Sequence, residues 1–199
     1  MPIDAADLDP DPARQLAAWL AEAEAAGVRL PGAFALATAD GAGAPSVRMV
    51  LLRTLDQRGL AFFTDRRSRK GRDLRANPRA AATFWWDSLD RQVRAAGRVE
   101  PLPREESAAY WSTRPPASRL SAWASVQGQP IGSRELLERR VAEIAARLGE
   151  DPPLPGHWGG YRLIPEAWEF WESRADRLHD RVEYRPRREG GWRCRRLQP

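Results

Sequence analysis

The spacing of hydrophobic and polar residues predicts a chain of short strands and helices. An amphipathic helix is expected after Asp11-Pro12, because Leu16, Trp19 and Leu20 recur at helical spacing before Gly27. Extended runs separated by turn residues then cover 33–39, 46–55, 59–64, 80–86 and 92–99. Strands spaced this closely are typical of an antiparallel barrel or sandwich.

Helices are expected to interrupt and follow these strands, and the last third of the chain returns to strands. Helices are expected over 68–76, 104–112, 118–125 and 133–148, and further strands over 160–164, 168–171, 178–184 and 192–197. The proline-rich stretch 151–155 is expected to form a rigid loop. We therefore predict a mainly β fold with helices, as one domain over 1–199 with a flexible N-terminus over 1–11.

Composition narrows the class of protein. The 199 residues are 42% hydrophobic and 30% charged, and no apolar run approaches the roughly 20 residues of a membrane span. The acidic start lacks the apolar core of a signal peptide, and Cys194 is the only cysteine, which together favour the cytoplasm. One cysteine and two histidines are too few ligands for a protein-built zinc or iron–sulfur site, so no metal site is predicted.

Charge leaves several partners open. The net charge of +5 is compatible with nucleic acid, a membrane surface or small phosphorylated ligands. No motif of interleaved aromatic and basic residues supports nucleic acid, so neither that partner nor a membrane is expected. Nearly all the basic residues are arginine, and Lys70 is the only lysine, which suggests a specific need for an ammonium group there.

Three stretches place cations where an anion would stabilise them. Ser68-Arg69-Lys70-Gly71 puts two cations in the first turn of a helix, where they oppose the helix dipole unless an anion binds. Arg48 and Arg53 flank an apolar strand and point to opposite faces unless the strand bends. In an extended segment Arg177, His179 and Arg181 share one face. The alternatives are a solvated helix end, a solvent-facing arginine and an edge strand with a solvated basic face.

Tyr110, Arg114 and Ser118 recur every fourth residue around Arg114-Pro115-Pro116. Two hydroxyls and a guanidinium that converge near a helix start would form a phosphate clamp. Taken singly, each of these residues is unremarkable.

Eight motifs, in order from about residue 12 to the C-terminus, resemble those of the pyridoxine (pyridoxamine) 5′-phosphate oxidases. They are Arg48-Met49-Val50-Leu51-Leu52, Ser68-Arg69-Lys70-Gly71, Arg91-Gln92-Val93-Arg94, Ser112-Thr113-Arg114-Pro115, Ala122-Trp123-Ala124-Ser125, His157-Trp158-Gly159-Gly160-Tyr161-Arg162, Glu169-Phe170-Trp171 and Arg177-Leu178-His179-Asp180-Arg181. The resemblance implies an antiparallel FMN-binding split β-barrel and a homodimer whose flavin sites are shared between chains.

The resemblance also implies roles for individual residues. Arg48, Arg69 and Lys70 would hold FMN, chiefly its phosphate. The remaining flavin contacts would come from Met49, Val50, Leu51, Phe63, Thr64, Gln92, Gln127, Gly128, Trp171 and Arg181. The substrate phosphate would bind Arg53, Tyr110, Arg114 and Ser118, while Arg177 and His179 would be the catalytic residues that lie over the pyridine ring. The implied reaction oxidises pyridoxamine or pyridoxine 5′-phosphate to pyridoxal 5′-phosphate, with O2 as acceptor and H2O2 as product.

Some positions depart from the family pattern. Arg53 replaces a lysine, Phe63 a tyrosine and Gly128 a serine, and the basic, tyrosine-containing segment before the first helix has no counterpart. The alternatives are a sister FMN oxidase of phenazine-type secondary metabolism, or a non-catalytic flavin-binding split-barrel protein. The retained Tyr110, Arg114 and Ser118 favour a phosphorylated pyridine.

Overall fold

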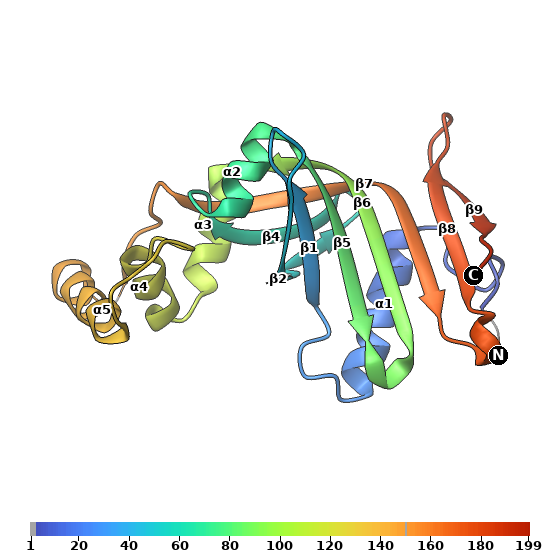
Figure 1. Cartoon of the computed structure of the whole chain (residues 1–199), viewed down its shortest axis with the longest axis horizontal. Coiled ribbons are helices and arrows are strands. Elements are labelled where there is room, and N and C mark those ends of the chain that lie inside the picture. Colours follow the sequence, from blue (N-terminus) through green and yellow to red (C-terminus); the bar gives the residue numbers. More distant parts are fainter. Residues whose placement is uncertain (1–2, 150) are drawn as a thin grey trace.

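The computed structural model describes residues 3–149 and 151–199, which form an antiparallel sheet flanked by helices (Figure 1). The strands are β1 Ala33–Ala39, β2 Pro45–Leu51, β3 Thr54–Asp56, β4 Gly59–Asp65, β5 Arg79–Trp86, β6 Arg91–Pro101, β7 Trp158–Glu172, β8 Asp180–Pro186 and β9 Trp192–Arg196. The helices are α1 Pro12–Ala25, α2 Arg69–Ala76, α3 Arg104–Thr113, α4 Pro116–Ala124 and α5 Arg134–Leu148, with 3-10 turns at Asp87–Leu89 and Ala175–Arg177. The predicted mainly β, antiparallel architecture is confirmed.

The long strand β7 joins two parts of the sheet. The strand order is β2-β1-β5-β6-β7-β4-β3, and β8 and β9 continue from the far end of β7. Residues 158–163 of β7 pair with β4, whereas residues 168–172 pair with β8, and β6 pairs along both parts. Because β7 exchanges one neighbour for another along its length, the sheet opens into a split barrel.

A bulge accompanies this exchange of neighbours. The register of β6 against β7 shifts between Ala96 and Gly97, next to Pro165. A side chain at Gly97 would collide with the carbonyl of Ile164, so glycine permits the close approach of the two backbones.

Helix α1 covers the apolar core of the barrel. It begins at the N-cap Asp11, whose side chain accepts a hydrogen bond from the amide of Ala13, and Pro12 occupies its first turn. Its apolar face buries Leu16 and Trp19, and the indole of Trp19 packs edge-on against Phe170 at 5.1 Å between ring centroids.

The N-terminal segment was expected to be flexible, but its described residues, 3–11, pack against the barrel. Ile3 and Leu8 are buried in the core. The hydroxyl of Tyr184 donates to the carbonyl of Asp9 at 2.9 Å, and Arg196 donates to the carbonyl of Ile3 at 2.7 Å. Residues 3–11 are therefore folded against the barrel, because two apolar side chains and two backbone acceptors find partners there; residues 1–2 lie outside the described part.

Three strand predictions were wrong in detail. The run expected over 46–55 divides into β2 and β3, since the chain leaves the sheet at residues 52–53. The runs 160–164 and 168–171 belong to one strand, β7. Strand β8 begins only at Asp180, so the residues before it form a turn.

Helices α3, α4 and α5 extend away from the barrel, at the left of Figure 1. Helix α4 buries only Ala124, and α5 buries no residue completely.

None of the helices among the described residues has the length and apolar character needed to span a membrane.

Candidate functional site

A cavity of about 440 Å³ lies where the barrel meets helices α3 and α4. It is lined by Met49, Val50, Leu51, Arg53, Phe63, Thr64, Asp65, Lys70, Tyr110, Arg114, Ser118, Ser121, Ala122, Ser125, Gln127 and Trp158. The cavity thus brings together seven residues expected to bind the cofactor and all four expected to bind a substrate phosphate. Their roles remain predictions.

Lys70 is a buried cation at one side of this cavity. Its ammonium donates to the hydroxyl of Thr64 at 3.0 Å and to the side-chain oxygen of Gln127 at 2.9 Å, both of which are neutral. Within the described residues it forms no ion pair. Burial, and then the neighbouring Arg48 cation, lower the pKa of Lys70 from 10.5 to about 8. A bound anion would remove this electrostatic penalty.

Arg48 and Arg69 do not line the cavity with Lys70. The guanidinium of Arg48 donates to the hydroxyl of Thr38 at 2.7 Å and lies 3.7 Å from the carboxylate of Asp73. Burial lowers the pKa of Arg48, the nearby Asp73 raises it, and the cation of Arg69 lowers it again. Arg48, Arg69 and Lys70 therefore form one group of neighbouring cations, although only Lys70 reaches the cavity wall.

The hydroxyl at the N-cap of α2 already donates a hydrogen bond within its own turn. Ser68 is the N-cap, but its hydroxyl donates to the carbonyl of Asp65 at 2.7 Å. This bond closes the turn that leads from β4 into α2. An anion bound by Arg69 and Lys70 at this helix end remains a prediction.

Arg114 is a second, partly buried cation of the cavity. Its guanidinium lies 4.7 Å from the ring centre of Trp158 and donates to the carbonyl of Ser118 at 2.9 Å. Its buried Nη1 has no hydrogen-bond partner within the part of the chain that the structure describes. Burial lowers the pKa of Arg114, and the cations Arg53 and Arg119 lower it further, against an opposing effect of Tyr110. A buried donor atom without a partner, on a cation, is suited to an anionic ligand.

Aromatic rings form one wall of the cavity. Phe63 stacks on Tyr110 at 4.1 Å and on Trp158 at 5.4 Å, with interplanar angles of 21° and 9°. The guanidinium of Arg53 lies 5.6 Å from the ring centre of Tyr110. A planar ring with an anionic arm would find apolar surface and cations on the same wall.

Among the described residues that line the cavity, Asp65 is the only one with a carboxylate, and this carboxylate is paired with Arg67. Arg67 binds it at 2.8 Å and also donates to the carbonyl of Ser125 at 3.1 Å. The cavity consequently keeps the positive charge of Lys70, Arg53 and Arg114.

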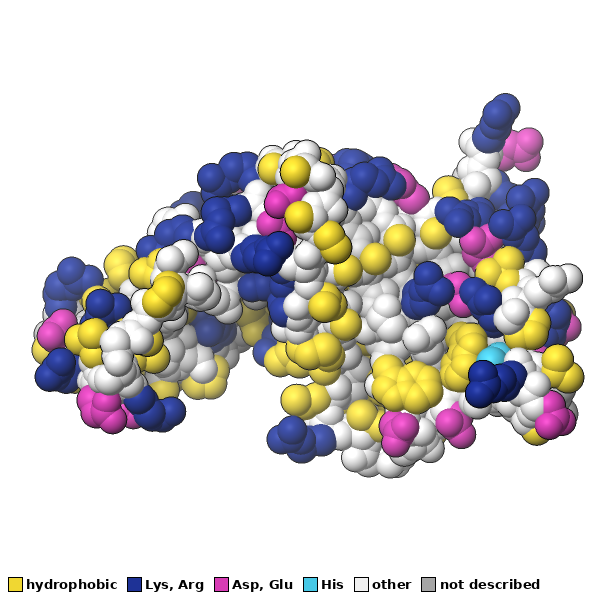
Figure 2. All heavy atoms as spheres, in the orientation of Figure 1, with side chains coloured by type: hydrophobic (Ala, Val, Ile, Leu, Met, Phe, Trp, Pro, Cys, Tyr) yellow, Lys and Arg dark blue, Asp and Glu magenta, His cyan; other side chains and the backbone are white. Residues whose placement is uncertain are grey.

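The remaining predicted residues form a second cluster around the far end of β7. Trp171 pairs in register with Gln92 on β6 and with Arg181 on β8, and its ring lies 4.7 Å from that of His179. Figure 2 shows hydrophobic side chains next to a histidine on this part of the surface. The side chain of Arg181 forms an ion pair with Glu169 through Nε at 2.9 Å and donates from Nη1 to the carbonyl of Gln198 at 3.0 Å.

The shared strand face predicted for Arg177, His179 and Arg181 was wrong. Arg177 belongs to the 3-10 turn before β8, and it and Asp176 have φ values of 61° and 56°. Left-handed backbone at two successive residues other than glycine is strained, and such strain is concentrated at functional positions. The turn leaves Arg177 exposed, with no ion pair to any residue in the described ranges.

Gly128 also lies outside the cavity lining. Its φ of 85° favours glycine, which accounts for a residue without a side chain after Gln127. The turn holds Gln127 beside Lys70 without contributing a side chain of its own.

Five lining positions were given no role from the sequence: Asp65, Ser121, Ala122, Ser125 and Trp158. Trp158 was noted as part of a family motif. Ser121, Ala122 and Ser125 follow Ser118 at spacings of three, four and seven, so they share its face of α4. That helical spacing was the available signal.

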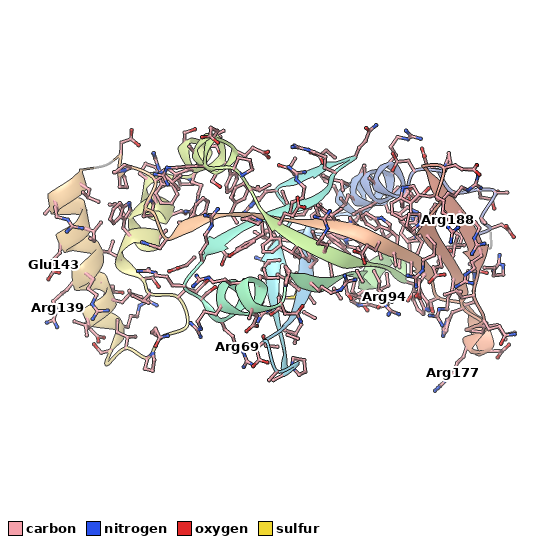
Figure 3. All side chains as sticks on the ribbon, turned by 90° about the horizontal axis from the view of Figure 1, so that it is seen from above. Arg69, Arg94, Arg139, Glu143, Arg177 and Arg188 are labelled. Carbon is pink, nitrogen blue, oxygen red and sulfur yellow. The ribbon has the colours of Figure 1, made fainter. Side chains whose placement is uncertain are left out.

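The two clusters are far apart in a single chain. Trp158 lines the cavity and Trp171 lies in the second cluster, at opposite ends of β7. The intervening residues span about 40 Å of extended chain at ~3.3 Å per residue. Figure 3 shows Arg177 at one end of the molecule, well away from Arg69 on α2.

Comparison with known proteins identifies the family. A family model described as pyridoxamine 5′-phosphate oxidase matches residues 20–147, and one described as the pyridoxine 5′-phosphate oxidase C-terminal dimerisation region matches residues 158–199. The chain belongs to the pyridoxamine 5′-phosphate oxidase family. The resemblance recognised in the sequence motifs is confirmed.

Relatives in this family match over nearly the whole chain. A pyridoxine/pyridoxamine 5′-phosphate oxidase of Cupriavidus necator is 51% identical over 193 residues, which cover 97% of this chain and 91% of the relative. One of Bordetella avium is 54% identical over 188 residues, which cover 94% and 89% respectively.

Solved structures confirm the split-barrel fold of the pyridoxamine 5′-phosphate oxidase family. PhzG from Burkholderia lata, in complex with tetrahydrophenazine-1-carboxylic acid, superposes with a TM-score of 0.91 at 37% identity, covering 97% of this chain and 95% of that one. A pyridoxamine 5′-phosphate oxidase-related, FMN binding protein from Nostoc punctiforme superposes with a TM-score of 0.75 at 21% identity, covering 92% and 96%.

Proposed function

We propose that this protein is an FMN-dependent oxidase that converts pyridoxamine or pyridoxine 5′-phosphate to pyridoxal 5′-phosphate. Two electrons and two protons leave the substrate at C4′ and pass to O2, which becomes H2O2; the imine formed from the amine then hydrolyses. The observation that carries the proposal is a pair of cations on one aromatic-walled cavity: the buried Lys70, and Arg114, which is partly buried and whose buried Nη1 has no partner among the described residues. A cofactor phosphate and a substrate phosphate would each require one of them.

The residues present fit FMN. Lys70 is a buried ammonium with neutral partners, as an anion site requires, and Arg48 and Arg69 add positive charge nearby. Gln127, beside Lys70, supplies an amide within the cavity lining. Bound flavin would supply the two-electron acceptor that no side chain provides.

The substrate phosphate would bind Arg53, Tyr110, Arg114 and Ser118. The orphaned Nη1 of Arg114 would gain a partner, and a phosphate would offset the repulsion between Arg114 and Arg53. With its phosphate held there, the pyridine ring would lie along the aromatic wall formed by Phe63, Tyr110 and Trp158. Fixing both ends of the reacting pair in this way supplies orientation, which is a large part of catalysis in such reactions.

His179 would orient the ring through its Nε2. Its Nδ1 accepts a hydrogen bond from the backbone amide of Arg174 at 3.2 Å, so the neutral ring carries its proton on Nε2. Arg177, presented by the strained turn, would place a cation over the substrate ring and stabilise charge that develops as hydride leaves C4′.

A homodimer with shared sites would complete the active site. The cavity and the His179 cluster lie about 40 Å apart along one strand, too far for one small ligand to contact both. A two-fold pair could set the cavity of each protomer against the other's cluster. The matched dimerisation region at residues 158–199 supports this arrangement.

Complementation tests the shared site. A mixture of Arg114→Ala and Arg177→Leu chains, dissociated and reassembled together, should recover about a quarter of the parental rate. Half of the dimers would be mixed, and each mixed dimer would have one site without either substitution. No recovery above the two separate variants would contradict sharing.

A phenazine-type oxidase is the second candidate. It is favoured by the TM-score of 0.91 with PhzG, whose structure holds tetrahydrophenazine-1-carboxylic acid. The deciding experiment is anaerobic reduction of the bound flavin by pyridoxine 5′-phosphate, pyridoxamine 5′-phosphate and a reduced phenazine carboxylic acid. Bleaching of the flavin spectrum by the phosphates supports the proposal, whereas bleaching by the phenazine alone would reject it.

A further inference from the structure

The proline-rich segment 151–155 contacts both helices that carry the proposed phosphate clamp. Each of its first four residues accepts from a side chain of α3 or α4, and the helices alternate along the segment. Asp151 pairs with Arg119 of α4, and the carbonyl of Pro152 accepts from the indole of Trp111 on α3 at 2.9 Å. The carbonyls of Pro153 and Leu154 accept from Trp123 of α4 at 2.7 Å and Arg104 of α3 at 3.2 Å.

The composition of the segment suits this bridging. Prolines have no N–H and a fixed φ, so the segment offers acceptors and loses little entropy on ordering. A residue before proline favours extended backbone, in which successive groups point to different sides. One short segment can therefore reach two helices at once.

Helix α4 depends on such contacts because it has little core of its own. Only Ala124 is buried among its nine residues. The helix carries Ser118 on its cavity face, and Arg114 lies in the junction between α3 and α4. A change in the angle between the two helices would therefore move Arg114 relative to Ser118 and Tyr110.

We propose that residues 151–154 are a strap that fixes α3 against α4, and that Arg119 and Trp123 are positioning residues for the phosphate clamp. The inference rests on the proposed function for the identity of the phosphorylated ligand. Neither Arg119 nor Trp123 lines the cavity, so both act through Arg114 and Ser118.

The test is the double variant Arg119→Gln/Trp123→Phe, which removes a charge pair and an indole N–H but keeps both side chains similar in size. We expect the KM for pyridoxine 5′-phosphate to rise about tenfold, a change of about 1.4 kcal/mol, with kcat within about twofold of the parent. FMN affinity should change much less than phosphate affinity, because Lys70 lies on α2, outside the two helices that the strap joins. The matched control is Trp192→Phe on β9, away from the strap.

Binding measurements test the strap independently of turnover. Calorimetry on the FMN-loaded protein should show weaker binding of pyridoxine 5′-phosphate and of inorganic phosphate to the double variant than to the parent or the control. Restoring the cation alone, with Arg119→Lys/Trp123→Phe, should recover part of the loss. If the parent protein binds these phosphates but does not oxidise pyridoxine 5′-phosphate, the proposed function is wrong. The difference in phosphate binding between parent and double variant would still support the strap. Equal phosphate affinity in parent and double variant would overturn the strap.

Discussion

Replacing Lys70 by methionine should stabilise the flavin-free protein at neutral pH while weakening its binding of FMN. The ammonium is buried against neutral oxygens, and its pKa falls from 10.5 to about 8. Each pKa unit corresponds to about 1.4 kcal/mol, so the charged form is disfavoured by about 3 kcal/mol. Loss of the hydrogen bonds to Thr64 and Gln127, about 1 kcal/mol each, offsets part of this. The expected net gain at pH 7 is about 1 kcal/mol.

The pH dependence has a definite sign. Between about pH 8 and pH 10.5 the unfolded chain keeps the Lys70 proton while the folded, flavin-free chain has released it. The free energy of unfolding of the parent must therefore rise with pH across this window relative to that of Lys70→Met. The penalty is present in full below pH 8 and absent above pH 10.5. Urea unfolding of the two flavin-free proteins at several pH values measures the difference directly.

FMN should reverse the effect of the substitution. A charge-assisted phosphate contact contributes about 1.5–3 kcal/mol, so Lys70→Met should bind FMN at least tenfold more weakly and riboflavin unchanged. Arg75→Met, an exposed position on the same helix, is the control and should alter neither quantity. Parallel stability curves for parent and variant, or equal losses for FMN and riboflavin, would refute the assignment of an anion to Lys70.

Other predictions address the substrate, the chemical step and assembly. Arg114→Ala should raise the KM for pyridoxine 5′-phosphate at least tenfold with FMN retained, measured by steady-state kinetics and flavin absorbance, while Arg53→Lys should be tolerated. Arg177→Leu should keep FMN but slow anaerobic flavin reduction in stopped flow, and His179→Asn, which keeps a donor, should be less impaired than His179→Leu. FMN should dissociate as dilution separates the dimer, which ultracentrifugation with flavin detection would follow; a monomer that retains FMN would contradict the shared site.

Local signals predicted the regular elements well. The strand Ala33–Ala39 has the predicted bounds, and α1 lies between its predicted cap and the glycine after it. These elements depend on alternation, capping and turn residues that are close in sequence. The division of the run 46–55 and the continuity of β7 depend instead on which strands become neighbours in space.

The candidate site shows the same contrast. The cations around Lys70 and the set Tyr110, Arg114 and Ser118 were found from spacing and motifs, and the cavity brings the latter together. The turn at Arg177 was not foreseen, since a left-handed backbone at Asp176 and Arg177 has no residue signature of the kind glycine provides. Nor could spacing show that Arg48 forms its bonds with Thr38 and Asp73 inside its own chain.

The choice between the two proposed substrates depends on the walls of the cavity more than on its cations. Arg114 can pair with a carboxylate as well as a phosphate, so its orphaned donor alone selects only for an anion. Phe63 and the small residues Ser121 and Ala122 all line the cavity, so they bound the space available to a ring. A buried polar group left without a partner discriminates more strongly than an apolar wall that accepts a ring of another size. A phosphate that offers more acceptor oxygens to Arg114 and Arg53 than a carboxylate would therefore be favoured, provided that both rings fit.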